Sequence, residues 1–152
     1  MIIIVAALTP ERVIGKNGKL PWNIPEEYQM FQDLIKNGVA IMGRKTYEAI
    51  PRPMAVRPRI VVSQSKTHIP GVTVCPNVSA ALEKAKAFQK PIYIVGGTKI
   101  YEETIPLADK MYLSWIKKNY PGDTFFPEFD ESQWKIEKKE KYKEFELVVY
   151  RK

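Results

Sequence analysis

Short runs of apolar, often β-branched residues recur along the chain, and they predict strands that are buried on both faces of a sheet. The first run covers residues 2–8, and similar runs follow at residues 39–42, 60–63, 92–95 and 111–116. Between these runs the pattern predicts helices, over residues 25–36, 44–50, 79–88 and 99–105, and Ser79 is the expected cap of its helix. Because strands and helices alternate, we expect an α/β fold with a mostly parallel central sheet flanked by about four helices.

The end of the chain follows a different pattern. Residues 134–141 and 144–150 alternate polar with apolar side chains, which predicts an antiparallel hairpin that closes the sheet. The longest irregular segments are residues 9–24 and 51–58, and loops of that length in a compact domain are commonly functional. The chain has 152 residues, 45% of them hydrophobic, and shows neither a repeat nor a linker, so it fits a single domain over residues 1–152.

Composition narrows the classes of function. A single cysteine, Cys75, and a single histidine, His68, argue against a disulfide framework and a metal site, and they suit a reducing cytoplasm. The apolar runs are far shorter than the roughly 20 residues that span a bilayer, and the sequence after Met1 does not resemble a signal peptide. We therefore expect a cytoplasmic protein that does not contact the membrane.

The net charge favours anionic partners. Lys and Arg outnumber Asp and Glu by 24 to 17, which gives +7 and suits phosphates, carboxylates or nucleic acid. A nucleic-acid-binding domain is one alternative, because residues 135–143 are rich in lysine. However, Glu137 and Glu140 interrupt that run, as in a solvated hairpin, and no base-stacking motif accompanies it. Nucleic acid is therefore not an expected partner.

One carboxylate stands out in the predicted helix over residues 25–36. At helical spacing Glu27 falls on the edge of an apolar arc, aligned with Phe31 and Leu34, while Glu26 points away. A carboxylate that faces apolar surroundings has a raised pKa unless it is partnered, and is a candidate acid, base or ligand anchor. The alternative is a partly exposed first-turn glutamate favoured by the helix dipole, and position alone favours that alternative.

Two predicted strand-to-helix turns combine glycine with positive charge. They are Gly43-Arg44-Lys45-Thr46 and Gly96-Gly97-Thr98-Lys99. Glycine lets a phosphate approach the backbone, and helix N-termini present free N–H groups, so two such turns in one small domain favour a dinucleotide. Either turn alone could carry glycine for geometry only, and neither matches the Rossmann or P-loop pattern. A third cluster, Ser63-Gln64-Ser65-Lys66, could bind a phosphate monoester or form a solvated loop.

Several motifs along the chain occur together in the order and spacing of one enzyme family. They are Val5-Ala6-Ala7, Val13-Ile14-Gly15, Leu20-Pro21-Trp22-Asn23, Ile41-Met42-Gly43-Arg44-Lys45-Thr46-Tyr47-Glu48, Arg52-Pro53, Val95-Gly96-Gly97, Ile100-Tyr101 and Gly122-Asp123-Thr124. As a set they resemble the bacterial dihydrofolate reductases, from residue 1 to about residue 150. The resemblance implies NADPH-dependent reduction of 7,8-dihydrofolate to tetrahydrofolate, by hydride transfer to C6 and protonation at N5, in support of one-carbon and thymidylate metabolism.

The resemblance also implies a substrate site. Glu27 would bind the 2-amino group and a ring nitrogen of the pterin and support protonation at N5 through water, with Ser114 hydrogen-bonded to Glu27 and Trp22 holding the water. With Tyr101 these are the expected catalytic residues, and Arg57 would pair with the glutamate tail of folate. The implied substrate-binding residues are Val5, Ala6, Glu27, Tyr28, Phe31, Ile50, Arg52, Arg57, Val95 and Ser114. Antifolate inhibitors are further expected ligands, and without the resemblance each residue has an ordinary core or surface interpretation.

The cofactor site follows from the same resemblance. The nicotinamide would lie beside Ala7, Ile14 and Tyr101, and a 2′-phosphate beside Arg44, Ser63 and Lys66, so we expect NADPH rather than NADH. The implied cofactor residues are Ala7, Ile14, Gly15, Leu20, Gly43, Arg44, Lys45, Thr46, Ser63, Gln64, Ser65, Lys66, Gly96, Gly97, Thr98, Lys99, Ile100 and Tyr101. Residues 9–24 would form a lid, and we expect a monomer.

The chain departs from the family pattern at a few positions. Pro51 replaces the usual glycine, Ala55-Val56 replaces a Pro-Gly pair, and Thr98 stands where a third glycine is frequent. The first two leave the path of the loop toward Arg57 open. A second enzyme, the reductase domain of riboflavin synthesis, shares the fold class and NADPH, but it lacks the Leu-Pro-Trp segment and the acidic helix residue that follows it.

Overall fold

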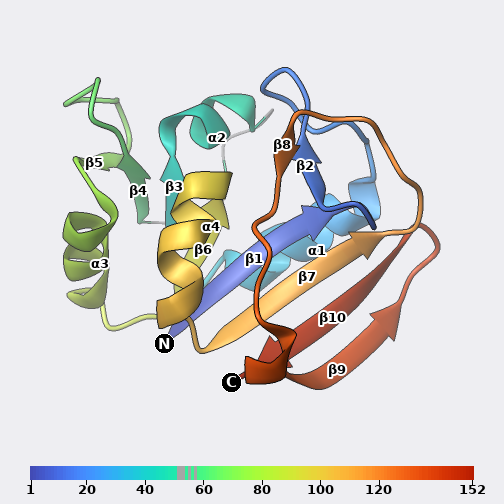
Figure 1. The fold of residues 1–152 in the computed structure, drawn as a ribbon. Coiled ribbons are helices and arrows are strands. Elements are labelled where there is room, and N and C mark those ends of the chain that lie inside the picture. The colour runs from blue at the N-terminus through green and yellow to red at the C-terminus, as the bar shows by residue number, and fades with distance from the viewer. Residues whose placement is uncertain (51–53, 55, 57) are drawn as a thin grey trace.

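The central feature of the computed structural model is a twisted sheet (Figure 1); residues 1–152 are described apart from 51–53, 55 and 57. Its strands are β1 (Ile2–Leu8), β3 (Val39–Gly43), β4 (Arg59–Val62), β5 (Thr73–Cys75), β6 (Ile92–Gly96), β7 (Lys110–Ile116), β9 (Lys135–Lys141) and β10 (Phe145–Arg151). Among the described residues they follow the order β5-β4-β3-β6-β1-β7-β10-β9. The pairings from β5 across to β7 are parallel, and β10 is antiparallel to β7 and β9. The predicted fold class is confirmed.

Helices cover both faces of this sheet, as the buried strand pattern requires. The helices are α1 (Pro25–Ile35), α2 (Arg44–Ala49), α3 (Val78–Lys86) and α4 (Thr98–Thr104), and the short 3-10 turns are η1 (Ile105–Leu107) and η2 (Glu131–Gln133). Successive β1 residues point to opposite faces. Ile3 belongs to the core cluster that also contains Ile35 of α1, whereas Ile4 belongs to the cluster that contains Ala81 of α3 and Ile100 of α4.

Some local features differ from the sequence expectation. Residues 9–24 are not wholly irregular, because β2 (Val13–Gly15) pairs with β8 (Thr124–Phe125), a partner more than 100 residues away. The cap of α3 is Asn77, which accepts a hydrogen bond from the backbone N–H of Ala80 at 2.8 Å. Ser79 lies inside the helix instead, because the buried stripe of α3 already begins at Val78 and the cap must precede it.

The closing hairpin is present, but its outer strand does not bury one face as the alternating pattern suggested. Ile136 on β9 is 54% exposed, and most other residues of that strand are exposed too. β9 is the edge strand of the sheet, and its many lysines discourage pairing with another chain.

The connections place a crevice at one end of the sheet. β3 and β6 are neighbours, yet the helices that follow them diverge: α2 packs with the cluster on the Ile3 face and α4 with the cluster on the Ile4 face. In α/β proteins such a divergence opens a binding crevice outside the carboxyl ends of the strands. Within the described part of the chain, no helix is long and apolar enough to cross a membrane.

Candidate active site

A cleft of about 1070 Å³ opens at this crevice. It is lined by these residues predicted for the substrate: Val5, Ala6, Glu27, Tyr28, Phe31, Ile50 and Val95. It is also lined by these residues predicted for the cofactor: Ala7, Ile14, Gly15, Leu20, Gly43, Arg44, Lys45, Thr46, Ser63, Gln64, Ser65, Gly96, Gly97, Thr98, Lys99, Ile100 and Tyr101. Two groups of residues from separate stretches of the chain therefore share one continuous cleft.

Glu27 is the buried carboxylate of this cleft. Its side chain lies on the first turn of α1, where Pro25 occupies an N-terminal position that needs no backbone donor, and only 8% of Glu27 is exposed. Burial raises the pKa of Glu27 to about 7, and a hydrogen bond with the Ser114 hydroxyl lowers that pKa by a smaller amount. The exposed first-turn interpretation of Glu27 is therefore wrong, and the side chain can hold or release a proton near neutral pH.

Ser114 is the hydrogen-bond partner of Glu27 and lies on strand β7. It lies on β7 opposite Ala7 of β1, and only 1% of it is exposed. A buried carboxylate needs hydrogen-bond donors, and a serine on a rigid central strand supplies one in a fixed position. The expected contact between Ser114 and Glu27 is confirmed, although Ser114 does not itself line the cleft.

Tyr101 connects two strands at the bottom of the cleft. Its hydroxyl lies 2.8 Å from the carbonyl oxygens of both Val5 and Val95, and it donates its single proton to one of them at a time. Burial is the main reason that the pKa of Tyr101 is raised, and the negative charge of Glu27 adds to the shift. Tyr101 is therefore neutral and holds β1 and β6 together at Val5 and Val95.

The two glycine turns lie against each other in the second half of the cleft. Gly96 has φ +122°, which favours glycine, and a Cβ there would lie 3.1 Å from the Tyr101 hydroxyl. A Cβ on Gly43 would lie 3.8 Å from the backbone of Gly97. Thr98, the departure from the family pattern, donates a hydrogen bond from its hydroxyl to the Phe125 carbonyl at 2.7 Å, so it joins α4 to β8.

The far end of the cleft is basic. Arg44 and Lys45 enter it from α2, and Ser63 and Ser65, whose hydroxyl oxygens are 3.5 Å apart, enter it after β4. Lys66 does not line the cleft, contrary to its predicted place, but its backbone N–H donates to the Ser63 hydroxyl at 3.1 Å. Its ammonium group is displaced toward a carboxylate on α2, at a distance of 3.8 Å.

Trp22 lies next to the cleft without lining it. Its indole is 7% exposed, and its ring packs on Tyr120 with 5.8 Å between ring centroids. The buried indole N–H has no hydrogen-bond partner among the described residues. Core packing therefore explains the ring of Trp22 but leaves its polar edge free to hold a water.

The expected lid is tied to the loop before β8. The backbone N–H of Asp123 donates to the Gly15 carbonyl at 3.0 Å, and the Asp123 carboxylate accepts from the backbone N–H of Asn17 at 3.0 Å. That second bond is the largest cause of the lowered pKa of Asp123. Gly15 and Asp123, which form the first of these bonds, both line the cleft, together with Gly18, Lys19 and Leu20.

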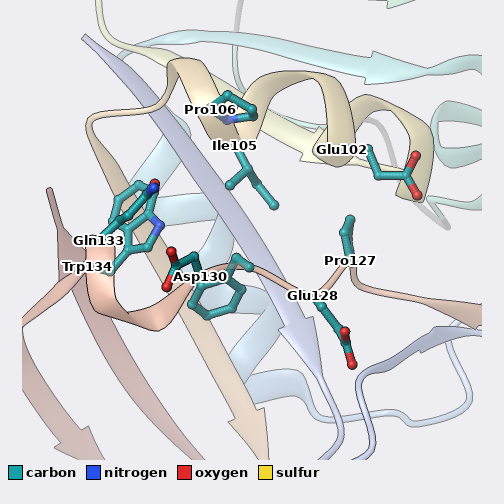
Figure 2. A pocket seen from close by; sticks show the side chains of 9 residues that line it. Glu102, Ile105, Pro106, Pro127, Glu128, Asp130, Gln133 and Trp134 are labelled. Atoms are coloured by element: carbon teal, nitrogen blue, oxygen red, sulfur yellow. The ribbon is translucent and has the colours of Figure 1, made fainter.

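A second hollow, of about 400 Å³, lies between α4, η1 and the segment before η2 (Figure 2). It is lined partly by the carboxylates of Glu102, Glu128 and Asp130. Figure 2 shows the carboxylates of Glu102 and Glu128 pointing in different directions. The Asp130 carboxylate accepts hydrogen bonds from the backbone N–H and the hydroxyl of Ser132. These side chains do not converge on a ligand, so the chemistry is assigned to the larger cleft.

Comparison with known proteins agrees with this arrangement. A sequence model described as dihydrofolate reductase matches residues 1–151. The chain belongs to the dihydrofolate reductase family. The dihydrofolate reductase of Bacillus subtilis is 34% identical over 161 residues, covering 100% of this chain and 95% of that protein. The Haemophilus influenzae enzyme is 35% identical, covering 88% of this chain and 83% of its own length.

Solved structures agree with the family assignment. The structure of dihydrofolate reductase from Enterococcus faecalis, complexed with NADP(H) and RAB-propyl, is similar with a TM-score of 0.91 and 30% identity. The similarity covers 99% of this chain and 95% of that one. The chain is therefore an oxidoreductase of the dihydrofolate reductase family, and the family assignment speaks against the nucleic-acid-binding and riboflavin-pathway alternatives.

Part of the cleft of this family member is lined by residues that had no predicted role. The additional lining residues are Gly18, Lys19, Ala49, Val62, Pro76, Asn77, Val78, Glu103, Asp123 and Thr124. Asp123 and Thr124 belong to a recognised motif but had no assigned role, and the signal that could have identified Asn77 was its capping position before α3. The predicted substrate residues Arg52 and Arg57 lie outside the described residues.

Proposed function

We propose that the protein reduces 7,8-dihydrofolate to 5,6,7,8-tetrahydrofolate with NADPH, and that it supports one-carbon and thymidylate metabolism. The observation that carries this proposal is the buried Glu27, hydrogen-bonded to Ser114, in a cleft that continues into the two glycine turns and a basic end. Overall, one hydride and one proton are added across the C6–N5 double bond, and NADPH becomes NADP⁺.

Glu27 binds the pterin in this proposal. Its two carboxylate oxygens accept hydrogen bonds from the 2-amino group and a ring nitrogen, a paired geometry that a single hydroxyl cannot offer. Tyr28, Phe31 and Ile50 line the same part of the cleft and supply apolar surface for the pterin and benzoyl rings. Arg57 would bind the glutamate tail, Arg52 would contribute to the same end of the site, and antifolate inhibitors would occupy the pterin position.

The second half of the cleft fits a dinucleotide. A Cβ on Gly96 would lie 3.1 Å from the Tyr101 hydroxyl and a Cβ on Gly97 would lie 3.4 Å from the Thr46 hydroxyl, so both positions are closely packed. Glycine at such a turn also lets a phosphate approach the backbone. Arg44 and Ser63, which line the cleft, offer a positive charge and a hydroxyl for a 2′-phosphate, and Lys66 adds positive charge from outside the lining, which supports NADPH over NADH. When bound there, NADPH supplies the hydride.

The chain itself contributes proton control and exclusion of water. Since the pKa of Glu27 is about 7, both of its forms are present near neutral pH, and the protonated form holds the proton that reaches N5 through water. The free indole N–H of Trp22 supports a role in holding that water. Residues 9–24 act as the lid, and Asp123 holds them over the cleft.

The direct test is loss of absorbance at the nicotinamide band with NADPH, in the presence and absence of dihydrofolate. We expect oxidation only with dihydrofolate, at a rate that falls as the pH rises through about 7. Glu27→Gln should lower turnover by about 10²- to 10⁴-fold at neutral pH. Glu26→Gln, on the exposed side of the same turn, is the matched control and should turn over like the parent. Equal turnover in the parent and Glu27→Gln would refute the role of Glu27.

We further propose that residues 1–152 form a single domain that acts as a monomer in the cytoplasm. The buried, unpaired thiol of Cys75 suits a reducing compartment, and the lysine-rich edge strand β9 disfavours pairing of sheets between copies. Light scattering coupled to size-exclusion chromatography tests the monomer, and a dimer mass at micromolar concentration would contradict it.

A further inference from the structure

Glu48, on α2, has no role in the site described above. Its carboxylate accepts hydrogen bonds from one nitrogen of Arg44, Nη1, at 3.0 and 3.2 Å. The same carboxylate lies 3.8 Å from the ammonium nitrogen of Lys66. Glu48 therefore lies between the two cations that the proposed function assigns to the 2′-phosphate, although they come from different elements of the fold.

The geometry lets Glu48 and a ligand share Arg44. The carboxylate engages a single guanidinium nitrogen, and a guanidinium carries donors on its other nitrogens. Arg44 lines the cleft, whereas Glu48 is absent from the described residues that line it. The carboxylate thus stays outside the cleft and acts on a bound anion through its charge rather than by occupying the space.

Glu48 reduces the positive charge at this end of the cleft before any ligand binds. Arg44 and Lys66 contribute two positive charges, and Glu48 removes one of them. A phosphate monoester carries about −1.5 to −2 near neutral pH. The two cations attract this phosphate and the carboxylate repels it. A dinucleotide without the phosphate experiences little of either effect.

We infer that Glu48 is a built-in counter-anion of the 2′-phosphate site, which holds Arg44 and Lys66 together in the free protein and limits the preference for NADPH over NADH. This inference rests on the proposed use of NADPH. The side chains of Arg44, Glu48 and Lys66 are 29%, 47% and 52% exposed, so water and salt screen their interaction. A screened repulsion between a carboxylate and a phosphate dianion within one Debye length changes the dissociation constant by about three- to tenfold.

Dissociation constants for NADPH and NADH, measured by calorimetry on the parent, Glu48→Gln and Glu103→Gln, test the inference. Glu103 is the matched control because it lines the cleft on α4 and carries the same charge, but no salt bridge joins it to Arg44 among the described residues. Glu48→Gln should tighten NADPH by about three- to tenfold and leave NADH unchanged, with a steeper salt dependence for NADPH. Glu103→Gln should shift both dinucleotides by the same factor.

Three results would overturn the inference. Weaker NADPH binding in Glu48→Gln would mean that the carboxylate positions Arg44 for the ligand. An equal gain for NADPH and NADH, or the same selective gain in Glu103→Gln, would mean that only overall charge matters. If the parent itself binds NADPH no more tightly than NADH, the proposed cofactor preference fails together with the inference. If the parent prefers NADPH and only the Glu48→Gln result differs from expectation, the inference alone fails.

Discussion

Burial of Glu27 makes the free energy of unfolding depend on pH, and Glu27→Gln should remove that dependence. The pKa of the carboxyl group is about 7 in the folded protein, against a reference value of 4.5. Below the reference pKa the group is protonated in both states. As the pH rises from there toward 7, the unfolded chain releases its proton while the folded protein keeps it, so the free energy of unfolding falls.

The size of this effect follows from the two pKa values. The difference of 7 − 4.5, or 2.5 units, at about 1.36 kcal/mol per unit gives about 3 kcal/mol. The loss is complete once the pH is well above the folded pKa. Glutamine does not titrate, so the stability of Glu27→Gln relative to the parent should rise by about 3 kcal/mol between roughly pH 4 and pH 8. The variant is therefore expected to turn over more slowly yet to gain stability relative to the parent as the pH rises, a trade between activity and stability.

Urea unfolding of the ligand-free protein at a series of pH values measures this difference. The slope with urea should be the same in parent and variant, so that midpoints report stability directly. Glu26→Gln is the control, since Glu26 is exposed on the same helical turn, and it should keep the pH dependence of the parent. A stability difference between Glu27→Gln and the parent that stays constant across this pH range would refute the reasoning.

Three further variants test the framework around the site. Tyr101→Phe removes the donor to two buried strand carbonyls and should lower the free energy of unfolding by about 1–3 kcal/mol in urea, whereas an unchanged midpoint would show that the hydroxyl is dispensable. Gly96→Ala should lower the free energy of unfolding by about 1–3 kcal/mol, because Gly96 has φ +122° and a Cβ there would lie 3.1 Å from the Tyr101 hydroxyl. Gly18→Ala is its control, since Gly18 has φ +77° but open space around it, and thermal denaturation should show a smaller loss of stability. Asp123→Ala removes the acceptor of the Asn17 N–H and should speed hydrogen exchange in residues 16–19 while leaving global stability within about 0.5 kcal/mol; unaltered exchange there would contradict a hold on the lid.

Local pattern was sufficient for much of this protein. The inner strands β1, β3, β4, β6 and β7 are covered on both faces, so their apolar runs are nearly continuous and their positions could be predicted to within a residue or two, whereas the short strand β5 was not predicted. The glycine turns at Gly43 and Gly96 could be recognised because each follows an apolar run and has a cation within three residues. Glu27 could be placed on the edge of an apolar arc because helical spacing is fixed by the backbone.

Contacts between segments that are distant in the sequence could not be predicted from local patterns. Ser114 meets Glu27 because β1 and β7 pair in one register, and that register depends on the whole sheet. The same limit applies to Asn17 and Asp123, which approach each other only when β2 pairs with β8.

Local sequence was therefore enough for most of the elements, the order in which they alternate and the residue types available at each turn, because these depend on neighbours within a few positions. The depth of burial of Glu27, and hence its pKa of about 7, depends on the folded arrangement, because desolvation involves every element that surrounds the carboxylate. The position of Lys66 beside Glu48 depends on it too, since charges on separate elements meet only once the chain has folded.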